Sequence, residues 1–339
     1  MHAGKLPPDL LEDLLRLAPT RDARVVLGPA VGEDAALVRF GRRLLVAKTD
    51  PITFATDAIG WYAVQVNAND VATLGARPRW FLASVLLPEG APEALAWEVF
   101  RQIGEACRRL GAVLVGGHTE VTVGLGRPIV VGCMLGEVLQ GREVTTRGAR
   151  VGDLVLLTKG IAIEGTAVLA REAAEALHGA GVPRRLVARA REFIYRPGIG
   201  VVQEALLACK HAKVHCMHDP TEGGLATGLW EVARAAGVGM LVHRERIPVL
   251  EETAAVCNAL GLDPLGLLAS GSLVLTAAPA EAHKVLAALE GRRIPVRIIG
   301  EVRPPEEGVR LRSAEGEVPL PTFPRDELAR FLSGGASTP

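Results

Sequence analysis

The stretch AIGWYAVQVNANDVATLGA, residues 58–76, carries the strongest structural signal in this chain. Its apolar residues recur at the spacing of an α-helix, which predicts a helix over about 58–75. Asn67 and Asp70 are three residues apart, so they share one face of that helix. A buried, unpaired carboxylate is costly, so a cation or a set of hydrogen-bond donors must compensate Asp70. Because the sequence offers no nearby Lys or Arg before Arg77, it favours a bound metal ion.

Two further acidic residues stand beside strands predicted upstream of this helix. Asp34 comes directly before the predicted strand 35–40, and Asp50 ends the predicted strand RLLVAKTD, preceded by Thr49. Oxygen ligands of this kind suit Mg²⁺, which binds a few carboxylates together with substrate phosphates. Taken singly, each aspartate could instead belong to a turn, as Asp and Asn often do.

The segment GGHTEVT, residues 116–122, stands at the end of an apolar strand that is predicted at 111–117 and expected to be buried. It places His118 and Glu120 at the carboxyl end of that strand. Residues i and i+2 of a strand share a face, which makes Glu120 one more candidate oxygen ligand. A histidine is more often a packed residue than a ligand, so the role of His118 stays open.

A second polar segment, HDPTEGG at residues 218–224, leads from a predicted strand into a helix predicted at 222–236. Asp219 fits an N-cap, with Pro220 at the first helical position and Glu222 at the third. A helix N-terminus beside two glycines is also a phosphate-binding site, so the structural and the functional interpretations are compatible.

Lys159 and Gly160 follow the apolar strand predicted at 154–158. Both could approach a phosphate group. A solvated loop lysine is the more common case, and it is the favoured interpretation here.

Composition narrows the class of protein. The chain has 339 residues, 49% of them apolar, which is enough for two domains with real cores and excludes disorder as a class. Lys plus Arg and Asp plus Glu are both 38, so the net charge is zero and no basic surface for nucleic acid or membrane is expected. Five isolated cysteines, no export signal and no run of about twenty apolar residues indicate a cytoplasmic protein.

The common nucleotide-binding and hydrolase signatures are absent from the sequence. There is no G-x-x-x-x-G-K-[ST], no G-x-G-x-x-G opening a helix, no G-x-S-x-G and no H-E-x-x-H. Any phosphate must therefore be bound by a metal, by backbone N–H groups or by a few placed cations.

Alternating helical and strand patterns predict an α/β fold of two sandwiches, each with one mostly antiparallel or mixed sheet. The charged, glycine-containing segment 147–153 is the best linker. We expect an N-terminal domain at 1–148, a C-terminal domain at 149–303, and a tail at 304–339 that ends in disorder.

The motifs in their order along the chain resemble the AIR synthase (PurM) superfamily. The matching segments are GEDAAL (32–37), KTD (48–50), NANDVATLGARP (67–78), GGHTEVT (116–122), HDPTEGGLATGL (218–229) and Ser270-Gly271. The resemblance spans most of the chain. It implies an N-terminal sheet that joins a partner's sheet in a barrel-like homodimer, a C-terminal α/β sandwich, and ATP with Mg²⁺ as cofactors.

The same resemblance assigns roles to individual residues. Asp34, Asp50 and Asp70 would be Mg²⁺ ligands, with Glu120 as a further ligand. Asp219, with His218, would face the reacting groups. Contacts to the nucleotide would come from Gly32, Thr49, Asn67, Gly116, Gly117, His118, Thr119, Lys159, Gly160 and Thr221.

Within the superfamily the resemblance is strongest to the hydrogenase-maturation protein HypE, but the sequence departs from its pattern. HypE ends in a cysteine that carries a carbamoyl group, whereas this chain ends FLSGGASTP and its last cysteine is Cys257. Ser270 stands where a glutamate is expected, and His118 stands where an aspartate is usual. These departures predict a HypE-like paralogue with another substrate.

Three functions stay open at this stage. The first is a Mg²⁺–ATP-dependent enzyme that phosphorylates or dehydrates a small substrate. The second is a kinase similar to thiamine-monophosphate kinase, suggested by Arg196-Pro197 after a predicted helix. The third is a non-catalytic ATP-binding or scaffold protein, suggested by the departures at His118 and Ser270.

Overall fold

A computed structural model describes residues 8–17, 19, 22–30, 33–53 and 57–334. The chain forms two compact units. The N-terminal unit consists of residues 20–29 and 34–143, and the C-terminal unit consists of residues 1–19, 30–33 and 144–339. The predicted linker 147–153 is therefore part of the C-terminal unit, and Gly148 and Asp153 are packed within it: a Cβ on Gly148 would lie 1.9 Å from the His215 carbonyl.

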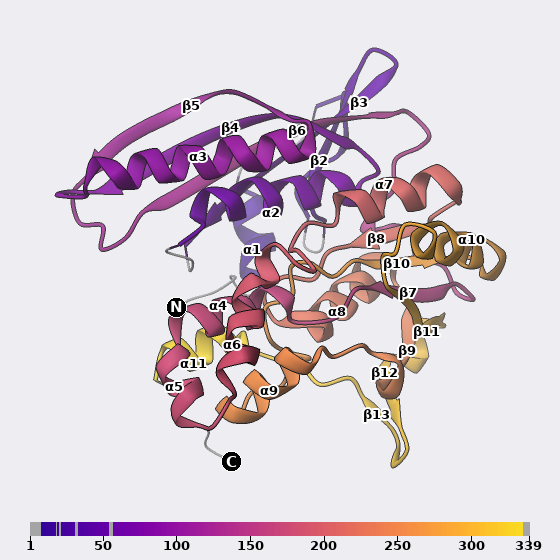
Figure 1. Cartoon of the computed structure of the whole chain (residues 1–339). Helices are drawn as coiled ribbons and strands as arrows, with labels where there is room; N and C mark the ends of the chain where they lie inside the picture. Colours follow the sequence, from indigo (N-terminus) through magenta and orange to yellow (C-terminus); the bar gives the residue numbers. More distant parts are fainter. Residues whose placement is uncertain (1–7, 18, 20–21, 31–32, 54–56, 335–339) are drawn as a thin grey trace. The chain divides into compact units, whose positions relative to one another are not determined.

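The N-terminal unit contains one mixed six-stranded sheet with the order β1-β2-β3-β6-β4-β5, in which only β4 and β5 run parallel. Figure 1 shows α2 (Ile59–Thr73) and α3 (Glu93–Leu110) lying along this sheet. The elements are β1 (Val25–Leu27), β2 (Ala36–Phe40), β3 (Arg43–Ile52), α2 (Ile59–Thr73), β4 (Arg77–Pro88), α3 (Glu93–Leu110), β5 (Val113–Thr122) and β6 (Ile129–Leu139).

Helix α2, which confirms the helix predicted at 58–75, is buried along all of its 15 residues. It contacts β3, β4, β6 and α3, so it has no solvent-facing side and no amphipathic stripe. The close approach to β6 depends on two glycines of that strand. A Cβ on Gly132 would lie 2.3 Å from Nδ2 of Asn67, and a Cβ on Gly136 would lie 2.4 Å from Cγ1 of Val71.

Strand β5 differs from its prediction as a buried strand. It lies at the edge of the sheet, pairs with β4 alone among the described strands, and exposes residues 113–121 on both of its faces. The apolar composition was correctly recognised, but composition alone does not tell whether a strand has a neighbour on each side.

The C-terminal unit contains a mixed seven-stranded sheet with the order β13-β12-β9-β11-β7-β10-β8, in which only β12 and β9 run parallel. Its strands are β7 (Leu154–Thr158), β8 (Cys216–His218), β9 (Gly239–His243), β10 (Val274–Ala277), β11 (Val296–Arg303), β12 (Val309–Ser313) and β13 (Gly316–Pro319). Its helices are α1 (Pro8–Leu15), α4 (Ile163–Glu172), α5 (Ala174–Gly179), α6 (Arg184–Arg191), α7 (Val202–His211), α8 (Gly224–Ala236), α9 (Glu251–Leu260), α10 (Pro279–Glu290) and α11 (Glu327–Leu332). Both sheets are mixed, as the strand pattern predicts.

The tail predicted after Arg303 contains regular secondary structure. Strands β12 and β13 extend the sheet, and α11 follows them. The abundance of Pro, Glu and Gly in this region reflects tight turns between short elements rather than disorder. Of the end predicted to be disordered, residues 333–339, all but Ser333 and Gly334 lie outside the described residues.

All five cysteines are free thiols. No described helix has the length and apolarity that crossing a membrane requires.

Candidate functional site

The N-terminal unit brings together the carboxylates of Asp34, Asp50 and Asp70, which we call the carboxylate cluster. Lys48 of β3 lies among them, with Nζ 2.8 Å from Oδ2 of Asp70 and 3.6 Å from Oδ2 of Asp50. The charge of Asp34 also acts on this lysine. The expectation that no cation lies near Asp70 was therefore wrong, because the lysine comes from a strand 22 positions earlier in the chain.

Electrostatics in the cluster are dominated by burial. Burial raises the pKa of Asp70 to about 6, and the negative charges of Asp34 and Asp50 add to this effect against the lowering influence of Lys48. Burial lowers the pKa of Lys48, but the three carboxylates more than reverse this, so its pKa is raised and the lysine is charged. Three carboxylates face one ammonium, which leaves an excess of up to two negative charges.

The oxygen donors of the cluster suit Mg²⁺, but in this structure the Lys48 ammonium lies among the carboxylates. Carboxylate oxygens are the ligands that Mg²⁺ prefers, and the excess negative charge favours a divalent cation. However, the described residues include no group of three or more His, Cys, Asp or Glu side chains that could hold a metal as they stand. The two observations agree if the lysine has to move before a metal is bound.

Asn67, on the same helix as Asp70, is held at the centre of the unit. Its Nδ2 donates to the carbonyls of Ala63, at 2.9 Å, and Asp50, at 3.2 Å. Its Oδ1 is buried and has no hydrogen-bond partner within the described part of the chain. A buried acceptor without a partner is costly, so this oxygen is available for a ligand. Thr49 points elsewhere, since its hydroxyl donates to the Gly132 carbonyl at 2.8 Å.

The predicted residues of β5 do not join the carboxylate cluster within the unit. Gly117 pairs with Ala83, which pairs with Gly132, which pairs with Asp50. Gly117 and Asp50 are thus three strands apart, roughly 14 Å at the usual strand spacing. Four more residues of β5 were predicted to contact the nucleotide or the metal, and all four are exposed: Gly116, His118, Thr119 and Glu120.

Both carboxylate oxygens of Glu120 have partners on β5 itself. One of its oxygens lies 3.0 Å from Nε2 of His118, and the other accepts from the Thr122 hydroxyl at 2.8 Å. These hydrogen bonds lower the pKa of Glu120, the Thr122 bond most. The two side chains at 118 and 120 share a face, as their spacing predicts.

In the C-terminal unit, Lys159 is buried and not solvated, contrary to the favoured interpretation. Its Nζ lies 2.9 Å from Oε1 of Glu204 and donates to the carbonyls of Gly198 and Gly200, at 3.0 and 2.6 Å. Both charged side chains are about 5% exposed. The Gly160 carbonyl accepts from the Ser272 hydroxyl at 2.5 Å.

The segment around Asp219 is a buried loop, and its predicted capping role was wrong. Helix α8 begins at Gly224 with Gly223 as N-cap, and both glycines have left-handed φ values of 67° and 79°. Such values favour glycine, which is why the chain turns here and not at residue 219. Asp219 and His218 are both buried, and Nε2 of His218 lies 3.0 Å from Oε2 of Glu231.

Two contacts fix this loop. The Thr221 carbonyl accepts from the Ala269 backbone N–H at 3.2 Å, and the Gly223 N–H donates to Oδ2 of Asp326 at 2.7 Å. Burial raises the pKa of Asp326 to about 6. Ser270, next to Ala269, is 1% exposed, and its hydroxyl has no hydrogen-bond partner among the described residues.

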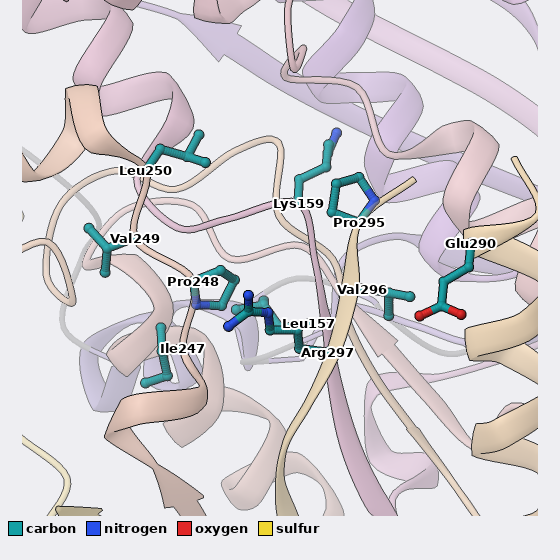
Figure 2. Close-up of a pocket in the computed structure, with 10 residues that line it drawn as sticks. All are labelled: Leu157, Lys159, Ile247, Pro248, Val249, Leu250, Glu290, Pro295, Val296 and Arg297. Atoms are coloured by element: carbon teal, nitrogen blue, oxygen red, sulfur yellow. The ribbon is translucent and has the colours of Figure 1, made fainter. Parts of the chain in front are cut away.

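A cavity of about 600 Å³ lies within the C-terminal unit. Its walls are mostly apolar and come from β7, β11 and the segment 247–250. In Figure 2 the amine of Lys159 points away from the other labelled side chains. Because that amine is engaged by Glu204, the cavity has few polar groups left to orient a ligand.

Gly32, predicted to contact the nucleotide, lies outside the described residues. Conversely, the structure gives contacts to three residues for which the sequence predicted no role: Lys48, Gly132 and Glu204. Lys48 stands in the KTD segment, and Gly132 also had a usable sequence signal, since a glycine inside a strand often marks the close approach of another element.

Comparison with known proteins places the chain in a family. The model "AIR synthase related protein, N-terminal domain" matches residues 32–138, and the corresponding C-terminal domain matches residues 150–312. The carbamoyl dehydratase HypE of Cupriavidus necator is 34% identical over 275 residues, which cover 77% of this chain and 74% of that protein. The chain belongs to the AIR synthase related family.

Other members of the family are similar over different lengths. A putative hydrogenase expression/formation protein of Methanocaldococcus jannaschii is 26% identical over 93% of this chain and 94% of its own length. A crystal structure of the hydrogenase maturation protein HypE in complex with ATP is 27% identical, covers 84% of this chain and 87% of its own, and has a TM-score of 0.68. The fold of this family member is therefore that of the AIR synthase superfamily, as predicted.

Proposed function

We propose that this AIR synthase related protein is a Mg²⁺–ATP-dependent enzyme that activates an oxygen of a small substrate by phosphoryl transfer. The observation that carries the proposal is the carboxylate cluster, with its excess negative charge, beside the unsatisfied Oδ1 of Asn67. The HypE structure in complex with ATP supports a nucleotide as the ligand.

In this proposal Asp34, Asp50 and Asp70 hold the metal. Mg²⁺ would supply neutralisation of the charge that develops on the transferred phosphoryl group. Asn67 Oδ1 would accept a hydrogen bond from the ligand or its water shell. The buried helix α2 fixes the positions of Asn67 and Asp70 relative to each other. Glu120, His118 and the glycines of β5 remain proposed ligand contacts.

For the C-terminal unit, we propose that Asp219 and His218 act on the reacting groups. Their burial in a loop that is fixed by Thr221 and Asp326 supports a positioning role. We assign the Lys159 side chain to the fold, because its three contacts occupy its three N–H donors. The Lys159–Gly160 backbone stays a proposed phosphate contact.

The substrate distinguishes this proposal from its alternatives. HypE relatives are named carbamoyl dehydratases, but Ser270 replaces the glutamate that the family pattern suggests for dehydration. We therefore propose a substrate other than that of HypE. ADP formation with thiamine monophosphate would support the kinase alternative, and ATP binding without ADP formation from any candidate substrate would support the scaffold alternative.

Replacing Asp70 with asparagine tests the proposal. We expect the Asp70→Asn variant to lose Mg²⁺-dependent ATP binding by at least about 10- to 100-fold, because one ligand charge is removed from a buried site. Isothermal titration calorimetry with ATP, with and without Mg²⁺, measures this effect. Glu98→Gln, which neutralises an exposed carboxylate on α3, is the matched control and should bind like the wild type. ATP binding that ignores both Mg²⁺ and Asp70 would contradict the proposal.

We also propose that the protein is a homodimer that pairs through β5. An exposed apolar edge strand is a template for pairing with another chain, and here Val113 and Val121 of β5 are 58% and 64% exposed. The double substitution Val113→Lys and Val121→Lys is expected to raise the dimer dissociation constant at least about tenfold, because lysines on an edge strand oppose pairing. Sedimentation velocity over a concentration series measures this constant.

The control for the dimer prediction is Val151→Lys, which places the same charge on an exposed valine of the C-terminal unit. It should leave the association unchanged. A wild-type chain that sediments as a monomer at all concentrations, or a β5 variant that associates normally, would refute pairing through β5.

A further inference from the structure

Lys48 has an unusual position for a lysine. Its ammonium lies 2.8 Å from Asp70 and 3.6 Å from Asp50, and its side chain is only 24% exposed. It therefore lies within ion-pair distance of both carboxylates, as a cation shared by both would have to. The single positive charge is outnumbered by the three carboxylates of the cluster, so the lysine only partly neutralises them.

We propose that Lys48 is an internal counter-ion that holds the place of the metal in the carboxylate cluster and withdraws when Mg²⁺ is bound. The inference rests on the proposed function in one respect, since it takes Mg²⁺ as the metal. It gives a role to Lys48, the first residue of the KTD segment, and it explains why the cluster has no ready-made metal site although its donors suit one.

The shape of a lysine side chain allows its ammonium to leave the cluster while the backbone stays in place. The backbone of Lys48 is fixed in β3, where it pairs with Met134 of β6, while the ammonium sits on a flexible four-carbon stem. The stem can swing without moving the strand. A displaced ammonium needs a new partner, and a phosphate group is a strong one. Metal and nucleotide would then favour each other's binding, because the metal releases the lysine and the phosphate accepts it.

The test uses Mg²⁺ alone, without nucleotide, on the full chain. Thermal unfolding is followed by circular dichroism over a Mg²⁺ titration for the wild type and for Lys48→Met and Lys48→Gln. We expect both variants to unfold at a lower temperature than the wild type without Mg²⁺. We also expect both to bind Mg²⁺ at least about tenfold more tightly than the wild type, with unfolding temperatures that rise accordingly. Glutamine keeps a hydrogen-bond donor near Asp70, so it covers the case in which the methionine variant does not fold.

Two controls separate this role from a merely structural one. Lys48→Arg keeps the positive charge and should show the weak Mg²⁺ response of the wild type. Arg43→Met removes another ion pair of β3, the one with Glu137, and should gain no Mg²⁺ response. Adding Asp70→Asn to Lys48→Gln should abolish the rise in unfolding temperature that Mg²⁺ causes in the Lys48→Gln variant.

The inference is overturned if the neutral variants bind Mg²⁺ no more tightly than the wild type. Because nucleotide is absent, failure of ATP binding in the calorimetric experiment would leave this result untouched. Conversely, a wild type that binds ATP in a Mg²⁺-dependent way, together with neutral variants that gain no Mg²⁺ affinity, would refute the role of Lys48 alone.

Discussion

Replacing Lys159 with methionine is expected to lower the free energy of unfolding by about 3–5 kcal/mol, the typical cost of removing one partner from a buried ion pair. Glu204 would be left as a buried carboxylate at about 5% exposure, and the carbonyls of Gly198 and Gly200 would lose a donor. Urea denaturation at neutral pH, followed by tryptophan fluorescence and circular dichroism, measures the loss.

A second substitution shows whether the loss comes from the unpaired charge. Adding Glu204→Gln to Lys159→Met removes the buried charge and should recover part of the lost stability. The control Lys284→Met removes the exposed ion pair with Glu281 and should cost under about 1 kcal/mol. A loss for Lys159→Met as small as that of the control would show that the pair is unimportant for the fold.

Replacing Gly132 with alanine is expected to destabilise the N-terminal unit by about 1–3 kcal/mol and to weaken Mg²⁺–ATP binding at least about tenfold. The added Cβ would lie 2.3 Å from Nδ2 of Asn67 and 2.9 Å from the ring of Phe81. The side chain of Asn67 cannot easily move away, because its amide donates hydrogen bonds to two carbonyls. The strain therefore reaches α2, which also carries Asp70. Denaturation and ATP calorimetry measure the two effects.

The matched control is Gly104→Ala in helix α3. A Cβ there would meet nothing closer than 3.8 Å, and the residue lies in a helix interior, where alanine is favoured over glycine by about 1 kcal/mol. This variant should be as stable as the wild type or more so, with unchanged ATP binding. If Gly132→Ala behaves in the same way, the contact between β6 and α2 is looser than the structure indicates.

The candidate site illustrates what a sequence can and cannot predict. The helix around Asp70 and the carboxylates next to strands could be predicted, because burial and spacing are local properties of the chain. The partner of Asp70 could not be predicted, because Lys48 reaches it through the packing of α2 on β3. The KTD segment contains Lys48, but nothing in its local pattern indicates that the side chain reaches Asp70.

The errors elsewhere have similar physical causes. Asp219 has the sequence context of a helix cap, but two glycines with left-handed φ values let the chain turn four residues later. Strand β5 has the composition of a buried strand, but its position at the sheet edge depends on strand order, which is a global property. The fold class could be predicted because it depends on the alternation of elements and not on their exact partners.

The position of Asp326 has a consequence for how this chain can vary in evolution. Asp326 caps α11 through the Leu328 N–H, and it also receives the Gly223 N–H from the loop that contains Asp219. The loop is thus held from more than one hundred residues downstream. Insertions or deletions between β13 and Asp326 would shift this anchor, so we expect related sequences to keep that spacing constant.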